Sequence, residues 1–157
     1  MVTKKNTKTP TKKAPLKRGG ADLRKVMGIK KDIKDFDDIV EFGLSSKNRE
    51  KRLMNFLKKT YSDENFEFII EVKKFEKNPT MGNFNKIYDI YLSNNSLRQI
   101  NIPSKIQKVL DAINKLPYSS SHKIQKDVFD AAVNDITRLI NSNSKGKFIE
   151  EELKRKS

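Results

Sequence analysis

The sequence predicts an all-α protein, and three observations carry this prediction. Apolar residues recur at the three- and four-residue spacing of amphipathic helices through most of the 157-residue chain. Ser, Thr and Asp, which favour helix N-termini, precede these apolar runs, and Gly, Pro, Ser or Asn follow them. Residues 66–72 alternate in part, but their acidic start and helical continuation favour a helix. No combination of strand and turn signals is strong enough to predict a sheet.

Two short helices are predicted at the start of the folded part. The first covers about residues 21–26 and ends near Gly28, a residue type that favours the position just after a helix. The second covers residues 35–42, with three Asp residues in its first turn and Gly43 after it. Negative charge there complements the positive end of the helix dipole, so a cation site is the weaker interpretation of these Asp residues.

The next two helices have the strongest signals. Ser45 or Ser46 can cap a helix that runs to Lys59. Ser62 offers a hydroxyl cap to the following helix, which ends before Asn78-Pro79. Its apolar residues occupy two adjoining faces, so it is expected to be buried on more than one side. These residues are Phe66, Phe68, Ile69, Ile70, Val72 and Phe75.

Four further helices and one connector are predicted in the second half. Thr80 can cap a fifth helix. Residues 98–103 form an extended connector, because the residue before a proline avoids the helical region. A sixth helix ends before Pro117, a seventh covers residues 122–141, and a last short helix covers residues 148–153.

The chain is long enough for one compact domain, which we place at residues 35–153, after a helical extension over 21–34. Residues 1–20 form a Thr/Lys/Pro-rich tail that is expected to be disordered. The tail can be a solvated leader, an arm drawn to anionic membrane, or an arm drawn to nucleic acid, in that order. Its basic residues are Lys4, Lys5, Lys8, Lys12, Lys13, Lys17 and Arg18.

The sequence lacks the common signatures of an enzyme. It has no glycine-rich phosphate loop, serine elbow, zinc-protease motif or calcium loop. His122 is the single histidine and there is no cysteine, so neither a metal site nor a cofactor is expected. The missing cysteines suit a reducing intracellular compartment. We therefore expect a cytoplasmic, monomeric protein without an active site of its own.

Two asparagines are not explained by local structure. Asn65 lies in the first turn of a helix, beside the better capping residue Ser62. Asn101 lies between Ile100 and Ile102, so its side chain is expected to point away from two anchored apolar neighbours. An amide on a short stiff loop is suited to hydrogen bonding with a partner. Taken singly, each asparagine is also a common turn residue.

Several segments in order resemble the regulator of G-protein signalling (RGS) family. Residues 56–68, Phe-Leu-Lys-Lys-Thr-Tyr-Ser-Asp-Glu-Asn-Phe-Glu-Phe, are similar to its FLKxEYSEENxxFW signature. Residues 87–88, 99–102 and 127–132 resemble its KKIYxxF, xEVNLD and CFDxAQ segments, and Lys147-Phe148 resembles its RFL segment. The similar segments are colinear and extend over about residues 35–153.

The resemblance implies a two-lobed helical domain that binds the α subunit (Gα) of a heterotrimeric G protein. Members of the family accelerate GTP hydrolysis by stabilising the switch regions of Gα, which already carries its catalytic arginine and glutamine. The resemblance implies that Asn101 contacts the catalytic glutamine and a switch threonine of Gα. It also implies that Glu64 and Asn65 make supporting contacts with the switch regions. The implied contact residues are Tyr61, Ser62, Glu64, Asn65, Asn101, Leu139, Asn143, Ser144 and Lys147.

The chain also departs from the family pattern. Thr60 replaces a glutamate and Ile69 a tryptophan, while Val72-Lys73 replaces a Cys-Glu pair. Asn143 replaces an aspartate that many members have, and Lys147 replaces an arginine, whose planar fork would hold a carboxylate more rigidly. The segment from Pro117 to Phe129 is longer than its counterpart in the family.

Three functions are consistent with these features. The first is acceleration of GTP hydrolysis by Gα, and the second is a scaffold that keeps the fold but not the activity. The third is a basic helical nucleic-acid binder that depends on the tail. We rank it last, because no predicted helix has a one-sided face of basic, base-reading residues. A tail bound to lipid would bring the protein to the inner face of the plasma membrane.

Overall fold

The computed structural model describes residues 32–157, which form one compact unit, Asp32–Ser157. Within that range the structure is all-helical, with a single isolated β-bridge and no strand, which confirms the predicted class. The basic tail and the helix predicted at 21–26 lie outside the described residues. The elements are η1 (Ile33–Asp35), α2 (Ile39–Leu44), α3 (Lys47–Lys59), α4 (Asp63–Phe75), α5 (Met81–Ile87), η2 (Tyr88–Leu92), α6 (Ser104–Asn114) and α7 (Asp130–Lys156).

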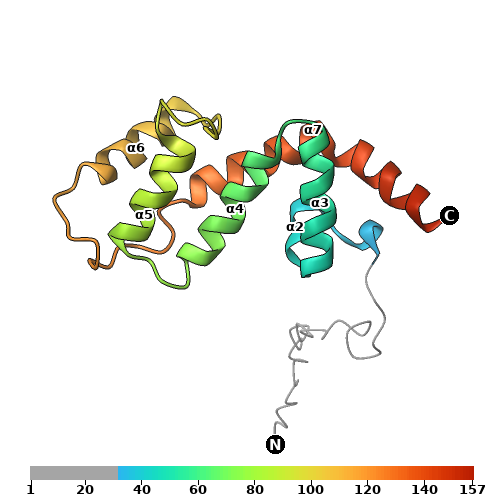
Figure 1. Cartoon of the computed structure of the whole chain (residues 1–157), viewed down its shortest axis with the longest axis horizontal. Coiled ribbons are helices and arrows are strands. Elements are labelled where there is room, and N and C mark those ends of the chain that lie inside the picture. Colours follow the sequence, from blue (N-terminus) through green and yellow to red (C-terminus); the bar gives the residue numbers. More distant parts are fainter. Residues whose placement is uncertain (1–31) are drawn as a thin grey trace, which may run out of the picture. The chain divides into compact units, whose positions relative to one another are not determined.

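The unit has two lobes (Figure 1). A cluster of aromatic side chains lies in each of them. One lobe contains α2, α3 and the second half of α7, and the other contains α5, η2 and α6. The helices α4 and α7 run through both lobes and pack against each other. The aromatic residues of the first lobe are Phe36, Phe42, Phe56 and Phe148. Those of the second lobe are Phe68, Phe75, Phe84, Tyr88, Tyr91 and Phe129.

The helix predicted at 35–42 is shorter at its start and longer at its end. It begins at Ile39, because the Asp38 carboxylate accepts the Glu41 N–H and so caps the helix there. The helix continues through Gly43, which is buried. A Cβ atom at Gly43 would come within 2.6 Å of Leu53 Cδ2 and 2.8 Å of the Phe66 ring. Gly43 is therefore a close-packing position between helices, not the helix stop that its residue type predicted.

Two predicted N-caps are confirmed. The Ser46 side chain accepts the Arg49 N–H at the start of α3, and the Thr80 side chain accepts the Asn83 N–H at the start of α5. The predicted cap by Ser62 is wrong in one respect. Ser62 precedes α4 as expected, but its side chain makes no capping bond, and its Oγ lies 2.9 Å from Thr60 Oγ1.

Residues 122–129 are not α-helical, where the sequence predicted the start of the seventh helix; they comprise a bridge residue, irregular residues and a turn over 126–129. Backbone bonds hold this segment beside α5, with the Met81 N–H donating to the His122 carbonyl and the Ile124 N–H to the Pro79 carbonyl. These long-range bonds compete with a helical turn for the same backbone groups. They also place the Phe129 ring, which is fully buried, between α4 and α5.

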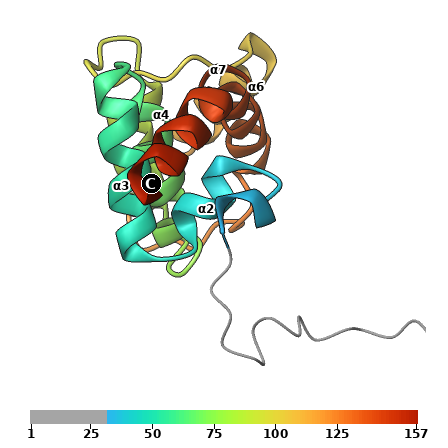
Figure 2. The ribbon, with the colours of Figure 1, turned by 90° about the vertical axis from the view of Figure 1, so that its right-hand side faces the viewer.

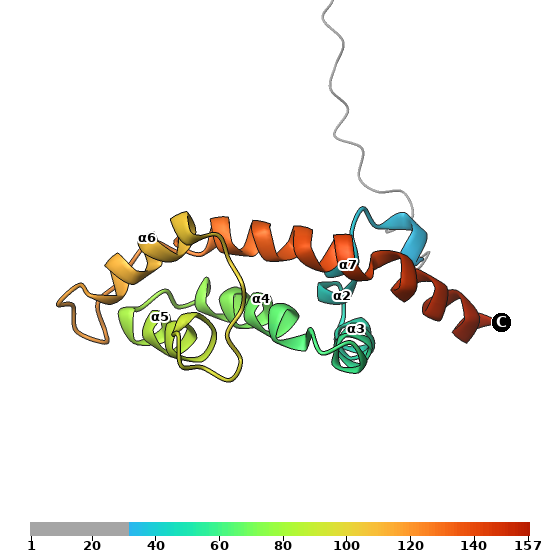
Figure 3. The ribbon, with the colours of Figure 1, turned by 90° about the horizontal axis from the view of Figure 1, so that it is seen from above.

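The helices predicted at 122–141 and 148–153 are one continuous helix, α7, which bends at its middle (Figure 3). The segment between them, Asn-Ser-Asn-Ser-Lys-Gly, has low helix propensity and would end an isolated helix. Tertiary packing overrides this preference. Phe148 packs on Phe42 and Phe56, and the buried Glu152 carboxylate lies 2.8 Å from Arg52 Nη2.

The helix α6 is held to the second lobe by both apolar and polar contacts, and the half-buried Ile106 and Ile113 pack against the core. Leu110 is the only residue of α6 that is fully buried. The Tyr88 hydroxyl donates to Asp111 Oδ1 at 2.7 Å, and the Gln107 amide donates to both Asp111 and the Leu92 carbonyl. These bonds stabilise the charged carboxylate and lower the pKa of Asp111, with the Gln107 bond the larger cause.

The Tyr88–Asp111 bond predicts alkaline destabilisation. Chiefly because its hydroxyl donates to Asp111, the pKa of Tyr88 rises to about 12 from an ordinary value of 10.0. A pKa that is raised in the folded state gives stability that is present below the ordinary value and lost as pH rises towards 12. We expect Tyr88→Phe to cost about 1.5 kcal/mol at pH 8, the value for a hydrogen bond to a charged group. This cost should disappear by about pH 12. Urea unfolding of both proteins across this pH range measures the difference, and a cost that does not change with pH would contradict it.

Candidate functional site

The turn between α3 and α4 projects one aromatic side chain into solvent. The helix α3 ends in a Schellman motif, in which the Ser62 N–H donates to the Leu57 carbonyl and the Tyr61 N–H to the Lys58 carbonyl. Tyr61 occupies the left-handed position of this motif, with φ of 52°, where glycine is the usual residue. Its side chain is 91% exposed. The chain thus keeps a bulky aromatic residue at a position that favours glycine, and the fold does not use its ring.

The first turn of α4 contains an asparagine whose side chain has no internal partner. Asn65 is 8% exposed as a residue, and no hydrogen bond joins its side chain to another residue of 32–157. Its polar atoms are not among the fully buried unpaired atoms, so the amide reaches solvent and is available to water or to a partner. Glu64, beside it, is half-buried, as is Ser62 at the end of the preceding turn.

Ion pairs fasten the connector 98–103 to α4. Arg98 Nη2 lies 3.0 Å from Asp63 Oδ2, and Arg98 Nε lies 2.6 Å from Glu67 Oε2. These contacts, with the Asp63 bond as the largest cause, raise the pKa of Arg98. The Tyr91 hydroxyl also donates to Glu67, at 3.0 Å, and burial together with this carboxylate raises the pKa of Tyr91. These pairs could not be predicted from the sequence, because 31 and 35 residues separate Arg98 from its partners.

Asn101 is exposed on this anchored connector, as the alternating pattern predicted. Ile100 before it is 4% exposed, and its N–H donates to the Tyr91 carbonyl at 2.9 Å. Ile102 after it is half-buried and packs against the core. Pro103 then begins α6. The Asn101 amide is thus held on a backbone that is fixed on both sides.

The third predicted group lies in the middle of α7, where the sequence placed it at a helix end. Leu139 is half-buried, and Asn143 and Lys147 are exposed at successive four-residue intervals, which places the three on one side of the helix. Ser144 is only 6% exposed. Nearby, Asn141 Oδ1 accepts the Ile39 N–H at 3.0 Å, which ties this stretch of α7 to the start of α2.

The α3–α4 turn, the connector and the middle of α7 share one edge of the unit. All three lie at the top in Figures 1 and 2, two views that share the same vertical axis. Contacts of Arg98 join the connector to α4, and α4 packs on α7. By contrast, His122 is exposed at the far end of the second lobe, where it stacks on Tyr118.

The chemistry of this edge is that of a binding surface. It offers amides, hydroxyls, a carboxylate and an ammonium group, together with the exposed Tyr61 ring. Among residues 32–157, no group of three or more His, Asp or Glu side chains is placed to hold a metal ion. No helix in the same range has the length and apolar character that a membrane crossing requires.

The family comparison covers most of this unit. A family model described as "Regulator of G protein signaling domain" matches residues 43–155, from the end of α2 almost to the end of α7. No match was found among curated proteins. The matched range contains all three parts of the edge described above. The chain therefore belongs to the regulator of G protein signaling domain family, and it is a regulator of G-protein signalling that interacts with Gα subunits.

Proposed function

We propose that this RGS domain accelerates GTP hydrolysis by a heterotrimeric Gα subunit. Gα supplies the chemical groups, an arginine in cis and a glutamine that orients water. The RGS domain needs only to bind the switch regions more tightly in their transition-state arrangement than in the ground state. The size of the acceleration is then set by the difference between these two affinities.

The geometry of Asn101 is the observation that carries this proposal. An amide both donates and accepts, so one side chain can hold two groups of a switch region in a fixed relation. The buried Ile100 on one side and the packed Ile102 on the other fix the backbone from which it projects. Arg98 adds two ion pairs to α4. Because the connector is already ordered, less conformational entropy is lost when it binds. More of the contact energy is then available to distinguish the states of Gα.

Asn65 supports the same proposal from the other side of the connector. The residue is only 8% exposed, its amide is not among the fully buried unpaired atoms, and it makes no side-chain hydrogen bond within residues 32–157. A hydrogen bond from a switch backbone would satisfy a group that the domain itself leaves unpaired. Glu64 adjoins it and adds a carboxylate to the same contact.

Single-turnover GTP hydrolysis by a panel of purified Gα subunits tests the proposal. We expect the full chain to raise the rate at least tenfold for one or more Gα classes. It should also bind Gα in the GDP–aluminium fluoride form more tightly than in the GDP or GTP-analogue forms. Equal affinity for the three forms, with no acceleration, would instead identify a scaffold. Lys147 and Asn143, which depart from the family pattern, are the residues that this outcome would implicate.

Tyr61→Gly is predicted to stabilise the domain and weaken binding to Gα. A left-handed backbone costs most residues about 1–2 kcal/mol, and glycine avoids this cost but adds entropy to the unfolded chain. We expect a net gain of about 0.5–1 kcal/mol in the free energy of unfolding. Loss of the exposed ring should reduce affinity for transition-state Gα about tenfold, as for an interface tyrosine. Urea unfolding and binding to immobilised Gα measure the two effects. A gain in stability with unchanged affinity would remove Tyr61 from the interface.

A further inference from the structure

The outer face of α6 combines positive charge with apolar side chains that the fold does not bury. Lys105, Lys108, Val109, Ala112, Lys115 and Leu116 follow one another at helical spacing, and all six are exposed. Val109 is 56% exposed and Leu116 is 40% exposed. Tyr118, just beyond the helix, is 46% exposed and stacks on His122. We call these residues, from Lys105 to Tyr118, the α6 face.

Basic residues outnumber acidic residues around this face. Residues 103–126 contain five lysines and one acidic residue, Asp111. The Asp111 carboxylate is occupied by Tyr88 and Gln107 on the inner side of α6. Among residues 32–157, Lys105, Lys108 and Lys115 have no acidic partner within ion-pair distance. Lys115 interacts with Asp111 only at longer range, so the three ammonium groups can contact an anionic surface.

Folding does not account for the apolar members of the face. Leu110 is the fully buried residue of α6, and the half-buried Ile106 and Ile113 also pack against the core. Polar bonds through Asp111 and Gln107 complete the attachment, so Val109 and Leu116 are not needed for it. Val109 and Leu116 lie on the flank opposite Lys108 and Lys115, next to the half-buried Ile113. An apolar flank beside a lysine flank, with a tyrosine at its end, matches the side chains that lie at a bilayer interface.

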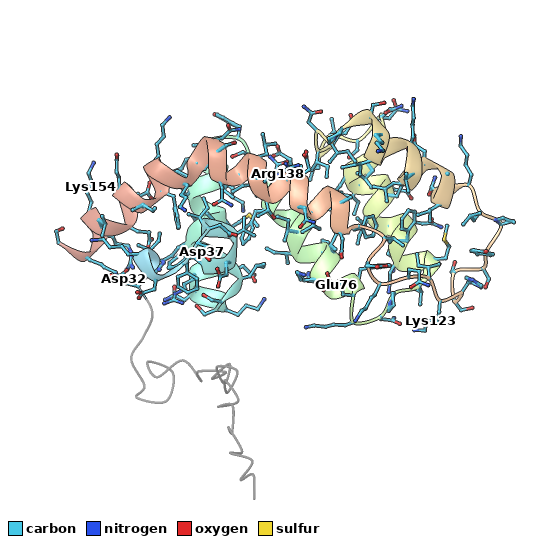
Figure 4. All side chains as sticks on the ribbon, turned by 180° about the vertical axis from the view of Figure 1, so that it is seen from behind. Asp32, Asp37, Glu76, Lys123, Arg138 and Lys154 are labelled. Atoms are coloured by element: carbon cyan, nitrogen blue, oxygen red, sulfur yellow. The ribbon has the colours of Figure 1, made fainter. Side chains whose placement is uncertain are left out.

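We propose that the α6 face docks on the surface of a membrane that contains anionic lipid. Lysine ammonium groups would contact lipid headgroups, while Val109 and Leu116 enter the boundary between headgroups and acyl chains. The face is on the second lobe, at the end of the unit opposite the C-terminus of the chain (Figure 3). Lys123, in the loop after α6, lies at the same end, far from Asp32 and Lys154 (Figure 4). The face begins at Lys105, four residues after Asn101 of the edge assigned to Gα, and the proposal does not depend on acceleration of GTP hydrolysis.

Vesicle co-sedimentation of the full chain tests this proposal. The charge of the basic tail must first be removed, because the tail carries seven positive charges that could bind anionic lipid by themselves. We would replace Lys4, Lys5, Lys8, Lys12, Lys13, Lys17 and Arg18 by Gln in the full-length chain. This tail-neutral protein should bind vesicles of phosphatidylcholine with 30% phosphatidylserine and should not bind pure phosphatidylcholine vesicles. Binding should weaken as salt is raised.

Charge removal on the α6 face is compared with equal removal elsewhere. In the tail-neutral chain, Lys105→Gln, Lys108→Gln and Lys115→Gln together should reduce partitioning on the order of 100-fold, about fivefold for each lysine. The matched control replaces Lys51, Lys58 and Lys77, which are also exposed, and should change it less than threefold. Equal losses in the two triple variants would overturn the proposal, since they would indicate net charge alone. Circular dichroism checks that both variants keep their helices.

A fluorescent reporter tests the apolar contact independently. The chain has no tryptophan, so Leu116→Trp gives a single emitter on the α6 face. Its emission should shift to shorter wavelength with anionic vesicles, and Val109→Ser in the same protein should reduce the shift. An unshifted spectrum during binding would overturn the proposed insertion. Saturable binding of single-stranded RNA or an acidic peptide at the same lysines, without a response to vesicles, would assign the face to another partner.

Discussion

Asn101→Ala is expected to reduce RGS-stimulated GTP hydrolysis by Gα about 10- to 100-fold. The loss corresponds to about 1–3 kcal/mol, the cost of leaving polar groups of a closed interface without their hydrogen bonds. Folding should be nearly unaffected, because the Asn101 side chain is exposed and an exposed substitution usually changes stability by less than about 0.5 kcal/mol. Single-turnover assays with saturating variant separate a loss of acceleration from a loss of affinity.

A matched asparagine in the same region serves as the control. Asn94 is also exposed and lies in the turn before the connector, away from the ion pairs of Arg98. Asn94→Ala should leave the stimulated rate within about twofold of the unsubstituted chain, which is the range expected for a residue outside the contact. If Asn101→Ala were equally harmless, the role assigned to Asn101 would be wrong. The Gα contact would then depend on Asn65 and the middle of α7.

Phe129→Ala is expected to cost about 4 kcal/mol of the free energy of unfolding, in the range for a buried phenylalanine. Phe129 is 0% exposed, and its ring lies 5.0 Å from that of Phe84, 5.1 Å from Phe75 and 6.0 Å from Phe68. The ring joins α4, α5 and the start of α7, so its removal leaves a cavity that several elements line. Urea unfolding should show a lower midpoint with an unchanged slope.

Two variants define the scale of this effect. Phe129→Leu keeps most of the apolar volume and should cost about 1–1.5 kcal/mol. Leu97→Ala removes a side chain that is fully exposed and should cost less than about 0.5 kcal/mol. A cost below about 1 kcal/mol for Phe129→Ala would contradict the packing of the segment 122–129 against α4 and α5.

Local signals predicted the class of the fold and most helix starts. The caps at Ser46 and Thr80 are bonds within four residues, so the sequence that surrounds them is sufficient to predict them. The burial of α4 was also predictable, since Phe66, Ile69 and Val72 mark faces that any packing must cover. The exposed Asn101 followed from the alternation around it.

Predictions failed where distant residues decide the local structure. Gly43 resembles a helix stop, yet Leu53 and Phe66 require a residue without a side chain at that position. Residues 141–147 resemble a break, yet the burial of Phe148 and Glu152 carries the helix through them. No local rule contains these partners, because they are brought together only by folding.

The sequence by itself determined that this protein is helical, that it resembles RGS domains, and which amides are surplus to folding. Only the tertiary structure decided that Arg98 fastens the connector to α4, and that α7 is one helix with its contact residues in the middle. It also decided that the α6 face stays uncovered. The physical reason is the separation along the chain between the residues that interact. Caps and apolar periodicity act within one or two turns, whereas ion pairs, close packing and exposure depend on residues that are far apart in the chain.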